Sequence, residues 1–126
     1  MNLLIAEDNE MNQQLMTLYM HKMGWDYLMV ADGQEALDAF GTHHFNAVLL
    51  DIDMPLVDGI AAARQIRLSD KTLPIIAITA FADEYMRTEC AEAGFNAFLS
   101  KPCSREEIMS LIIDCVETNS LSPALF

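Results

Sequence analysis

Five short apolar runs, rich in Leu, Ile, Val and Phe, alternate along the chain with longer amphipathic stretches. Strands separated by helices of this length are typical of βαβ units and a parallel sheet. A strand buried on both faces is apolar throughout, as these runs are. The pattern therefore predicts a parallel sheet covered by helices on both sides, with strands at 2–6, 27–31, 47–50, 74–79 and 95–100.

Side chains that can cap a helix N-terminus precede four of the five amphipathic stretches. Two of these caps have an acidic residue three positions later, the spacing of a capping box, and glycine follows two of the expected helix ends. We predict helices over about 10–23, 33–41, 59–68, 84–93 and 105–117. The capping residues are Asn9, Asp32 with Glu35, Asp83, and Ser104 with Glu107, and the glycines are Gly24 and Gly94.

In the first predicted helix, Met11, Leu15, Leu18 and Tyr19 share one apolar face, which we expect to pack on the sheet. The order of elements indicates an α/β protein of (βα)5 type, doubly wound with right-handed crossovers. In such sheets the ligand binds outside the carboxyl ends of the strands.

Length and charge narrow the class of protein. The 126 residues suffice for one domain with a single buried core. A net charge of −12 argues against a nucleic-acid partner, which needs a basic surface. No apolar run approaches the roughly 20 residues that cross a bilayer, and Glu7 and Asp8 follow the start too closely for a signal peptide. We expect a cytoplasmic domain over 1–118 and a tail or the start of a linker over 119–126.

Cysteine and histidine offer no metal site. Cys90, Cys103 and Cys115 are widely spaced and form no Cys-x-x-Cys motif, so we interpret them as buried thiols in a reducing compartment. His43 and His44 have no third ligand at a useful spacing and are interpreted as a helix-end or loop pair.

The polar residues of interest follow three of the predicted strands and end a fourth. Glu7 and Asp8 follow the first strand, Asp51 the third, and Lys101 the fifth, while Thr79 ends the fourth. Parallel strands bring all of them to one edge of the sheet. Three carboxylates held together repel one another unless a cation lies between them.

This set of groups suits phosphoryl chemistry. Mg²⁺ binds through one or two carboxylates, a phosphate and several waters. An aspartate can act as a nucleophile and carry a phosphoryl group, whose charge must then be neutralised. Mg²⁺, Lys101 and the Thr79 hydroxyl can provide that neutralisation.

The segments "LLIAEDN", "AVLLDIDMPLVDG", "IIAITA" and "FLSKP", in this order and spacing, resemble the receiver domain of two-component response regulators. The resemblance covers residues 2–116 and implies the flavodoxin-like fold with strand order 2-1-3-4-5. "EDN" followed by Asn12 is more similar to receivers of hybrid histidine kinases and phosphorelays than to chemotaxis-type proteins. A domain from a membrane-bound hybrid kinase would be tethered to the membrane.

The resemblance implies that Asp51 accepts a phosphoryl group from a phosphohistidine. Asp8 and Asp51 would bind Mg²⁺ directly, Glu7 through water, and Asp53 through its backbone carbonyl, with Mn²⁺ or Ca²⁺ as substitutes. Around the phosphate would lie the Lys101 ammonium, the Thr79 hydroxyl and the Ala80 backbone N–H. The Lys101–Pro102 bond would be cis, and Gly59 and Pro55 would shape the loop after the acceptor.

The resemblance also gives Phe98 the place of a switch aromatic, although a core aromatic of the fifth strand is the alternative. In the switch, Thr79 moves toward the phosphate and Phe98 turns inward, which changes the face made by the last two helices and the fifth strand. Asp53 and Phe81 occupy the positions that set the phosphoryl lifetime. We expect the Asp53 carboxylate to orient water or repel anions and Phe81 to restrict water.

Two other classes remain open. "DIDMP" is similar to the Asp-x-Asp motif of haloacid-dehalogenase-type phosphatases, but that motif usually continues with Thr or Val where this chain has Met54. The second class is a receiver-like interaction module that is not phosphorylated. For the receiver, the expected partners are a histidine kinase or histidine phosphotransfer domain and a downstream protein target. The expected state is a monomer or a weak, phosphorylation-dependent dimer, and the only expected catalysis is self-phosphorylation and slow autodephosphorylation.

Overall fold

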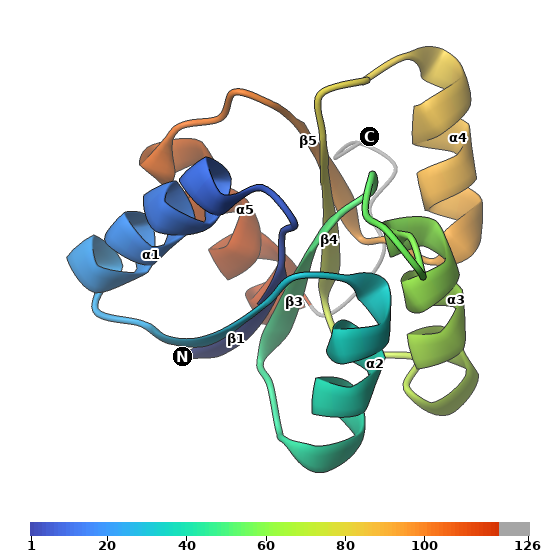
Figure 1. The fold of residues 1–126 in the computed structure, drawn as a ribbon, viewed down its shortest axis with the longest axis horizontal. Coiled ribbons are helices and arrows are strands. Elements are labelled where there is room, and N and C mark those ends of the chain that lie inside the picture. The colour runs from blue at the N-terminus through green and yellow to red at the C-terminus, as the bar shows by residue number, and fades with distance from the viewer. Residues whose placement is uncertain (119–126) are drawn as a thin grey trace.

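The computed structural model describes residues 1–118, and the predicted tail or linker at 119–126 lies outside the described residues. Strands and helices alternate along the chain (Figure 1). The strands are β1 (Asn2–Ala6), β2 (Asp26–Val30), β3 (Ala47–Asp51), β4 (Ile75–Thr79) and β5 (Ala97–Ser100). The helices are α1 (Glu10–Met23), α2 (Gly33–Thr42), α3 (Gly59–Ser69), α4 (Glu84–Ala93) and α5 (Arg105–Thr118).

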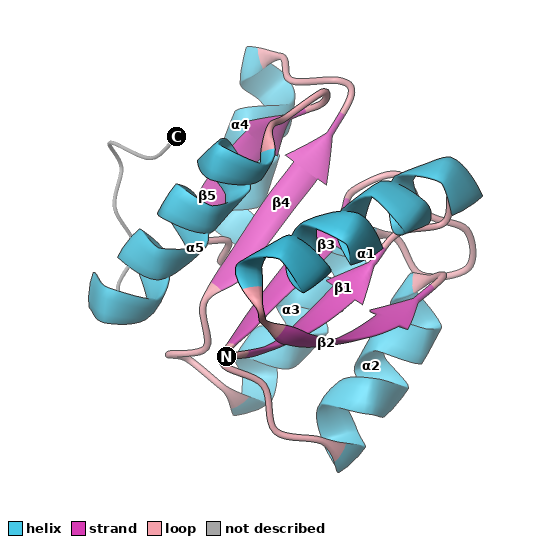
Figure 2. Cartoon of the chain, turned by 90° about the vertical axis from the view of Figure 1, so that its left-hand side faces the viewer, coloured by secondary structure: helices cyan, strands magenta, loops and turns pink. Residues whose placement is uncertain are grey.

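The five strands form one parallel sheet in the order β2-β1-β3-β4-β5. Helices α1 and α5 cover one face of the sheet and α2, α3 and α4 the other (Figures 1 and 2). The predicted fold class and strand order are confirmed. The chain passes from β1 to β2 on one side of it and then to β3, β4 and β5 on the other side. The point at which the strand order reverses therefore lies between β1 and β3.

Both faces of the central strands are buried, which explains their continuous apolar sequence. In β1, Leu4 and Ala6 pack with α2 and α3, whereas Leu3 and Ile5 pack with α1 and α5. Strand boundaries differ from the prediction by one or two residues. Phe95 was expected to open β5, but it precedes the strand and is fully buried.

The predicted helix caps are confirmed. The side chains of Asn9, Asp32 and Asp83 accept hydrogen bonds from the backbone N–H three residues later. Ser104 and Glu107 bond reciprocally, each side chain to the other's N–H, at 3.1 Å. Gly24 and Gly94 end α1 and α4 in the left-handed conformation, with φ of 72° and 99°. Asp58, which caps α3 by accepting from Ala61 N–H, was not foreseen.

The expected inner face of α1 is wrong for three of its four residues, whereas the fourth, Tyr19, is partly buried and packs against the core. Met11 is 78% exposed, Leu18 50% and Leu15 39%, and the buried residues of this helix are Met16 and Met20. Helix α1 is apolar on more than one side, so periodicity alone does not select the buried side. As a result, an apolar row remains in contact with solvent.

Candidate functional site

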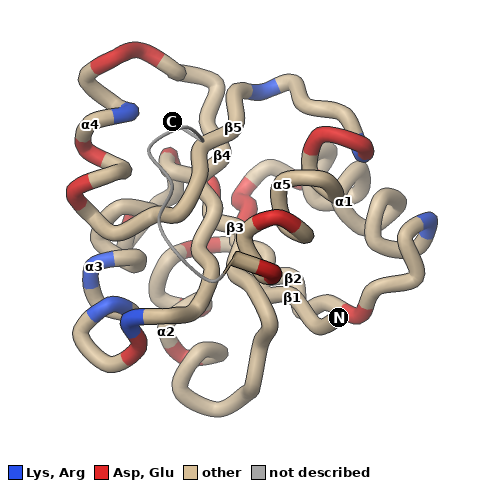
Figure 3. The backbone as a smooth tube through the Cα atoms, turned by 180° about the vertical axis from the view of Figure 1, so that it is seen from behind, with Lys and Arg blue, Asp and Glu red and all other residues tan. Residues whose placement is uncertain are grey.

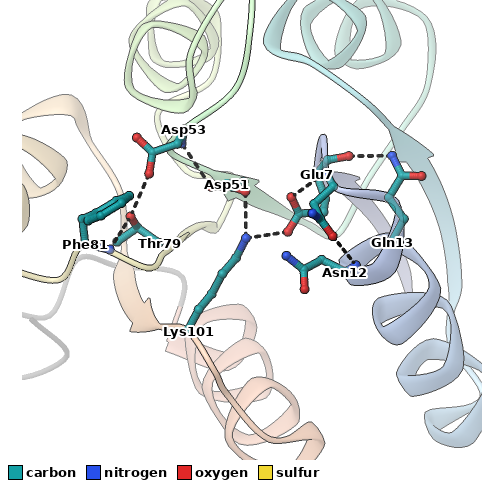
Figure 4. Close-up of polar contacts among 9 residues, drawn as sticks. Glu7, Asn12, Gln13, Asp51, Asp53, Thr79, Phe81 and Lys101 are labelled. Carbon is teal, nitrogen blue, oxygen red and sulfur yellow. Dashed lines mark hydrogen bonds and ion pairs between the residues drawn. The ribbon is translucent and has the colours of Figure 1, made fainter.

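The polar residues predicted to gather at the strand ends do so at the carboxyl edge of the sheet (Figure 4). Glu7 and Asp8 follow β1, Asp51 ends β3, Thr79 ends β4, and Lys101 follows β5. Neighbouring parallel strands therefore bring together residues up to 94 positions apart in the chain.

Three carboxylates form the acidic part of the site. Glu7, Asp8 and Asp51 each offer an oxygen, and these oxygens lie within 4.8 Å of one another. Glu7 and Asp51 are only 3% and 6% exposed, while Asp8 faces solvent. Oxygen donors of this type and number, two of them held rigidly and one open to water, fit a hydrated Mg²⁺ ion.

Lys101 joins two of these carboxylates. Its ammonium nitrogen lies 2.7 Å from Glu7 Oε1 and 2.8 Å from Asp51 Oδ2. Burial alone would lower the pKa of Lys101, but its hydrogen bonds to Asp51 and Glu7 outweigh burial and raise it. The lysine is therefore a fixed positive charge beside the predicted acceptor.

Glu7 is the group most perturbed by this environment. Burial, together with a hydrogen bond and repulsion from Asp51, raises the pKa of Glu7 to about 7, although Lys101 acts in the opposite direction. Two further contacts fix this turn: Asn9 N–H donates to Glu7 Oε2 at 3.2 Å, and the Gln13 side chain donates to the Glu7 carbonyl at 2.6 Å. Gln13 was not foreseen, since its role depends on the turn geometry.

The other side of the site is a chain of hydrogen bonds that starts at Asp51. Asp53 N–H donates to Asp51 Oδ1 at 3.0 Å, and the Thr79 hydroxyl donates to Asp53 Oδ2 at 3.3 Å. The hydroxyl oxygen accepts from Phe81 N–H at 3.1 Å. Thr79 is thus linked to Asp51 through Asp53, whereas Lys101 contacts Asp51 directly (Figure 4).

The loop after Asp51 approaches it closely. A Cβ atom at position 59 would collide with the Asp51 carbonyl, so glycine is required there by space rather than by its backbone angles. The residue with positive φ in this loop is Leu56, at 65°, and its side chain is 84% exposed. The Lys101–Pro102 peptide bond on the opposite side of the site is cis.

A groove of about 340 Å³ lies between α1 and the end of β5, beside the site. Ala80 and Lys101 contribute to its wall near the carboxylates. Apolar residues form much of the rest, including Leu15, Met16 and Pro102. The carboxyl edge is thus open next to an apolar surface.

Phe98 and the cysteines lie in the interior. Phe98 is 7% exposed, and the Arg87 guanidinium carbon lies 5.2 Å from the centre of its ring. The three thiols are free and buried, and burial raises the pKa of Cys90 to about 12. Within residues 1–118, one cluster of His, Cys, Asp or Glu side chains could hold a metal ion, and it consists of Glu7, Asp8 and Asp51.

A parallel α/β sheet with paired acids, an aspartate and a lysine at its carboxyl edge is the arrangement of a receiver-type fold. The family model of the response regulator receiver domain matches residues 3–113. The chain belongs to this family, which serves two-component and phosphorelay signalling.

Among curated proteins, the chain is 36% identical over 119 residues to the osmosensing histidine protein kinase SLN1 of Saccharomyces cerevisiae. The match covers 89% of this chain and 10% of SLN1, so the chain spans about a tenth of that relative.

Within residues 1–118, none of the helices combines the length and apolar character needed to cross a membrane.

Two solved structures are similar over nearly their whole length. The receiver domain of the sensor histidine kinase PA1611 from Pseudomonas aeruginosa, which holds a magnesium ion in its active site cleft, has a TM-score of 0.86 and 33% identity, covering 92% of this chain and 97% of that one. The receiver domain of the Saccharomyces cerevisiae response regulator Ssk1, crystallised with the histidine phosphotransfer protein Ypd1, has a TM-score of 0.87 and 26% identity, with 98% and 93% covered.

Proposed function

We propose that this domain, over residues 1–118, takes a phosphoryl group from a phosphohistidine onto Asp51. An Asp51 carboxylate oxygen attacks the phosphorus, the P–N bond breaks as the new P–O bond forms, and the imidazole retains the electron pair and takes up a proton. The observation that carries this proposal is the position of Asp51, whose carboxylate is shared between Lys101, at 2.8 Å, and the cluster of Glu7 and Asp8.

In this proposal Asp8 and Asp51 hold Mg²⁺ directly, Glu7 holds it through water, and the Asp53 carbonyl supplies a further oxygen. The bound cation would offset the charge of the carboxylates and of the incoming phosphoryl oxygens. Mn²⁺ or Ca²⁺, which also prefer oxygen ligands, are possible substitutes.

Lys101, Thr79 and Ala80 would receive the phosphoryl oxygens. Lys101 reaches the acceptor already, so a short shift of its flexible side chain would move one hydrogen bond from Asp51 to the phosphoryl group. The Thr79 hydroxyl and the Ala80 backbone N–H would donate from the β4 side. Asp53 and the 66% exposed Phe81 lie beside this position, where we propose that they set the lifetime of the acyl phosphate.

We propose that the phosphoryl donor is a histidine kinase or a histidine phosphotransfer domain that docks on α1. The exposed row of Met11, Leu15 and Leu18 lies next to the groove that leads to Lys101. The likeness to the Ssk1 receiver in its complex with Ypd1 supports a partner of this kind. Burying these side chains against a partner would stabilise the complex and place its histidine at the open edge.

The phosphorylated domain would signal by contacting a downstream protein through the face of α4, β5 and α5. The domain itself would be a monomer or a weak, phosphorylation-dependent dimer. Acidic residues outnumber basic ones along the chain, 19 to 7 (Figure 3). This excess of negative charge disfavours nucleic acid as a partner. We place the domain in the cytoplasm, where its free thiols would stay reduced. A membrane tether would follow if it is part of a membrane-bound hybrid kinase.

The test is labelling with acetyl phosphate and Mg²⁺, read by intact mass and peptide mapping. One phosphoryl group per chain is expected on Asp51, and none on Asp51→Asn. The matched control is Asp58→Asn, which removes one charge from the same loop and keeps a capping side chain. Wild type without label, or Asp51→Asn labelled equally, would refute the proposal. Sustained turnover of p-nitrophenyl phosphate would instead favour the phosphatase class.

A further inference from the structure

The Thr79 hydroxyl donates a hydrogen bond to a carboxylate at the mouth of the site. It donates to Asp53 Oδ2, with 3.3 Å between the two oxygens, and its own oxygen accepts the Phe81 N–H. Thr79 is fully buried, whereas Asp53 is exposed at the mouth of the site. The only acidic group that this hydroxyl contacts among the described residues is therefore the Asp53 carboxylate.

Thr79 and Phe98 lie on the same face of the sheet. Phe98 pairs in register with Ala77, and Thr79 lies two residues beyond Ala77 on the same strand. Side chains two apart in a strand point to the same face of the sheet. Thr79 and Phe98 are therefore neighbours on one face of the sheet.

Phe98 occupies the inward position in this structure. Its side chain is 7% exposed and packs in the core with α3 and α4, and the Arg87 guanidinium of α4 lies over its ring. Two features therefore occur together in this structure: a Thr79 hydroxyl that donates to Asp53 and a buried Phe98.

We propose that the Asp53 carboxylate takes the place of the phosphoryl group as the acceptor for Thr79, and thereby holds Phe98 inward in the unphosphorylated domain. Asp53 is then a positioning residue, acting on Phe98 through Thr79. Phosphorylation would exchange one anionic acceptor of the hydroxyl for another, so Phe98 would move little in wild type. This inference rests on the proposed function, because it concerns how that site reports its state.

Fluorine NMR of protein labelled with para-fluorophenylalanine tests the proposal. The chain has six phenylalanines, and the Phe98 signal is assigned by its loss in Phe98→Leu. Exposure of the ring is read from the solvent isotope shift in unphosphorylated, Mg²⁺-free samples. Wild type should give a buried signal. In Asp53→Ala the ratio of buried to exposed Phe98 should fall on the order of tenfold, the effect of losing one hydrogen bond to a charged group.

Matched variants separate the hydrogen bond from charge and packing. Asp53→Asn keeps an oxygen acceptor and should stay closer to wild type than Asp53→Ala. Thr79→Val should reproduce the Asp53→Ala shift, Thr79→Ser should not, and combining Asp53→Ala with Thr79→Val should add nothing further. Beryllofluoride with Mg²⁺ should return Phe98 of Asp53→Ala to the buried signal.

The proposal is overturned if Phe98 in Asp53→Ala remains as buried as in wild type, or if Asp58→Asn shifts it equally. The comparisons of wild type with Asp53→Ala and Asp58→Asn need neither Mg²⁺ nor a phosphoryl group, so their outcome is separate from the labelling of Asp51. If Asp51 takes the label but the exposure of Phe98 is unchanged in Asp53→Ala, only this inference is refuted. A protein whose Asp51 takes no label refutes the proposed function itself.

Discussion

At the scale of single residues, the site holds two buried carboxylates, whose charged forms burial destabilises, beside one ammonium group. Glu7 and Asp51 are almost inaccessible, and the ammonium of Lys101 offsets only part of their repulsion. Burial, together with the hydrogen bond to Asp51 and the repulsion from it, raises the pKa of Glu7. A site that repels its own second negative charge is prepared for a divalent cation.

The raised pKa of Glu7 predicts how stability depends on pH when metal is absent. The value rises from 4.5 to about 7 on folding, so the folded state binds the Glu7 proton more tightly than the unfolded state. Its contribution is fully present below pH 4.5 and is lost as the pH rises to about 7. We expect the free energy of unfolding of wild type, relative to Glu7→Gln, to fall by roughly 2–3 kcal/mol across this range.

Urea unfolding in a chelating buffer, at several pH values, measures this difference. Mg²⁺ should reduce the pH dependence of wild type, because the cation favours the charged carboxylate. Parallel curves for wild type and Glu7→Gln would show that the Glu7 proton is bound equally in both states.

At the scale of elements, α1 shows what its sequence determines and what it leaves open. Its start at the Asn9 cap and its end at Gly24 depend on local chemistry and were predicted. Its buried side was not, because methionine and leucine occur around much of the helix and the choice depends on which side meets the sheet. The same limit applies to Asp53, whose partner Thr79 is 26 residues away and cannot be inferred from spacing.

Two substitutions in α1 test the orientation of this helix. Met20 is fully buried, so Met20→Ala should lower the free energy of unfolding by about 2–4 kcal/mol through lost burial and a cavity. Met11 is 78% exposed, so Met11→Ala should change it by less than about 0.5 kcal/mol. Chemical denaturation of both variants measures the contrast. Equal losses in the free energy of unfolding would contradict the orientation of α1 in this structure.

The exposed row of α1 should matter for the partner and not for the chemistry. Leu15→Ser with Leu18→Ser removes apolar area that a histidine-containing partner would bury, at about 25 cal/mol per Å². We expect phosphotransfer from such a partner to slow at least tenfold, while labelling by acetyl phosphate keeps its wild-type rate. Transfer from a phosphorylated histidine phosphotransfer protein is compared with labelling by acetyl phosphate, and Leu68→Ser, at an exposed leucine on α3, is the control. A comparable slowing by both donors would assign the effect to the site itself.

At the scale of the whole molecule, the two edges of the sheet have different chemistry. The carboxyl edge carries the acids, Lys101 and the hydroxyl. At the amino edge, polar groups tie the backbone together: Asn96 is 3% exposed, and its side-chain oxygen accepts from Ile75 N–H at 2.9 Å and from Arg67 at 2.8 Å. Arg67 also donates to the carbonyls of Gly94 and Asp70.

The five-strand topology allowed the carboxyl edge to be predicted, because strand ends alone bring Glu7, Asp51, Thr79 and Lys101 together. The amino-edge contacts were not predicted. Arg67 and Asn96 are 29 residues apart, and neither belongs to a motif. Their pairing depends on how α3 and α4 pack, which is a property of the assembled fold rather than of either segment.

Asn96→Ala should therefore affect stability without affecting chemistry. Removing the amide leaves the buried Ile75 N–H and part of the Arg67 guanidinium without their acceptor, which costs about 2–4 kcal/mol in the free energy of unfolding. The acceptor site at the other edge keeps all its contacts, so the labelling rate of Asp51 per folded molecule should match wild type. Denaturation and acetyl phosphate labelling on the same sample measure both. If labelling fell in the folded fraction, the two edges would be coupled through the sheet, and the separation of stability from chemistry in this domain would not hold.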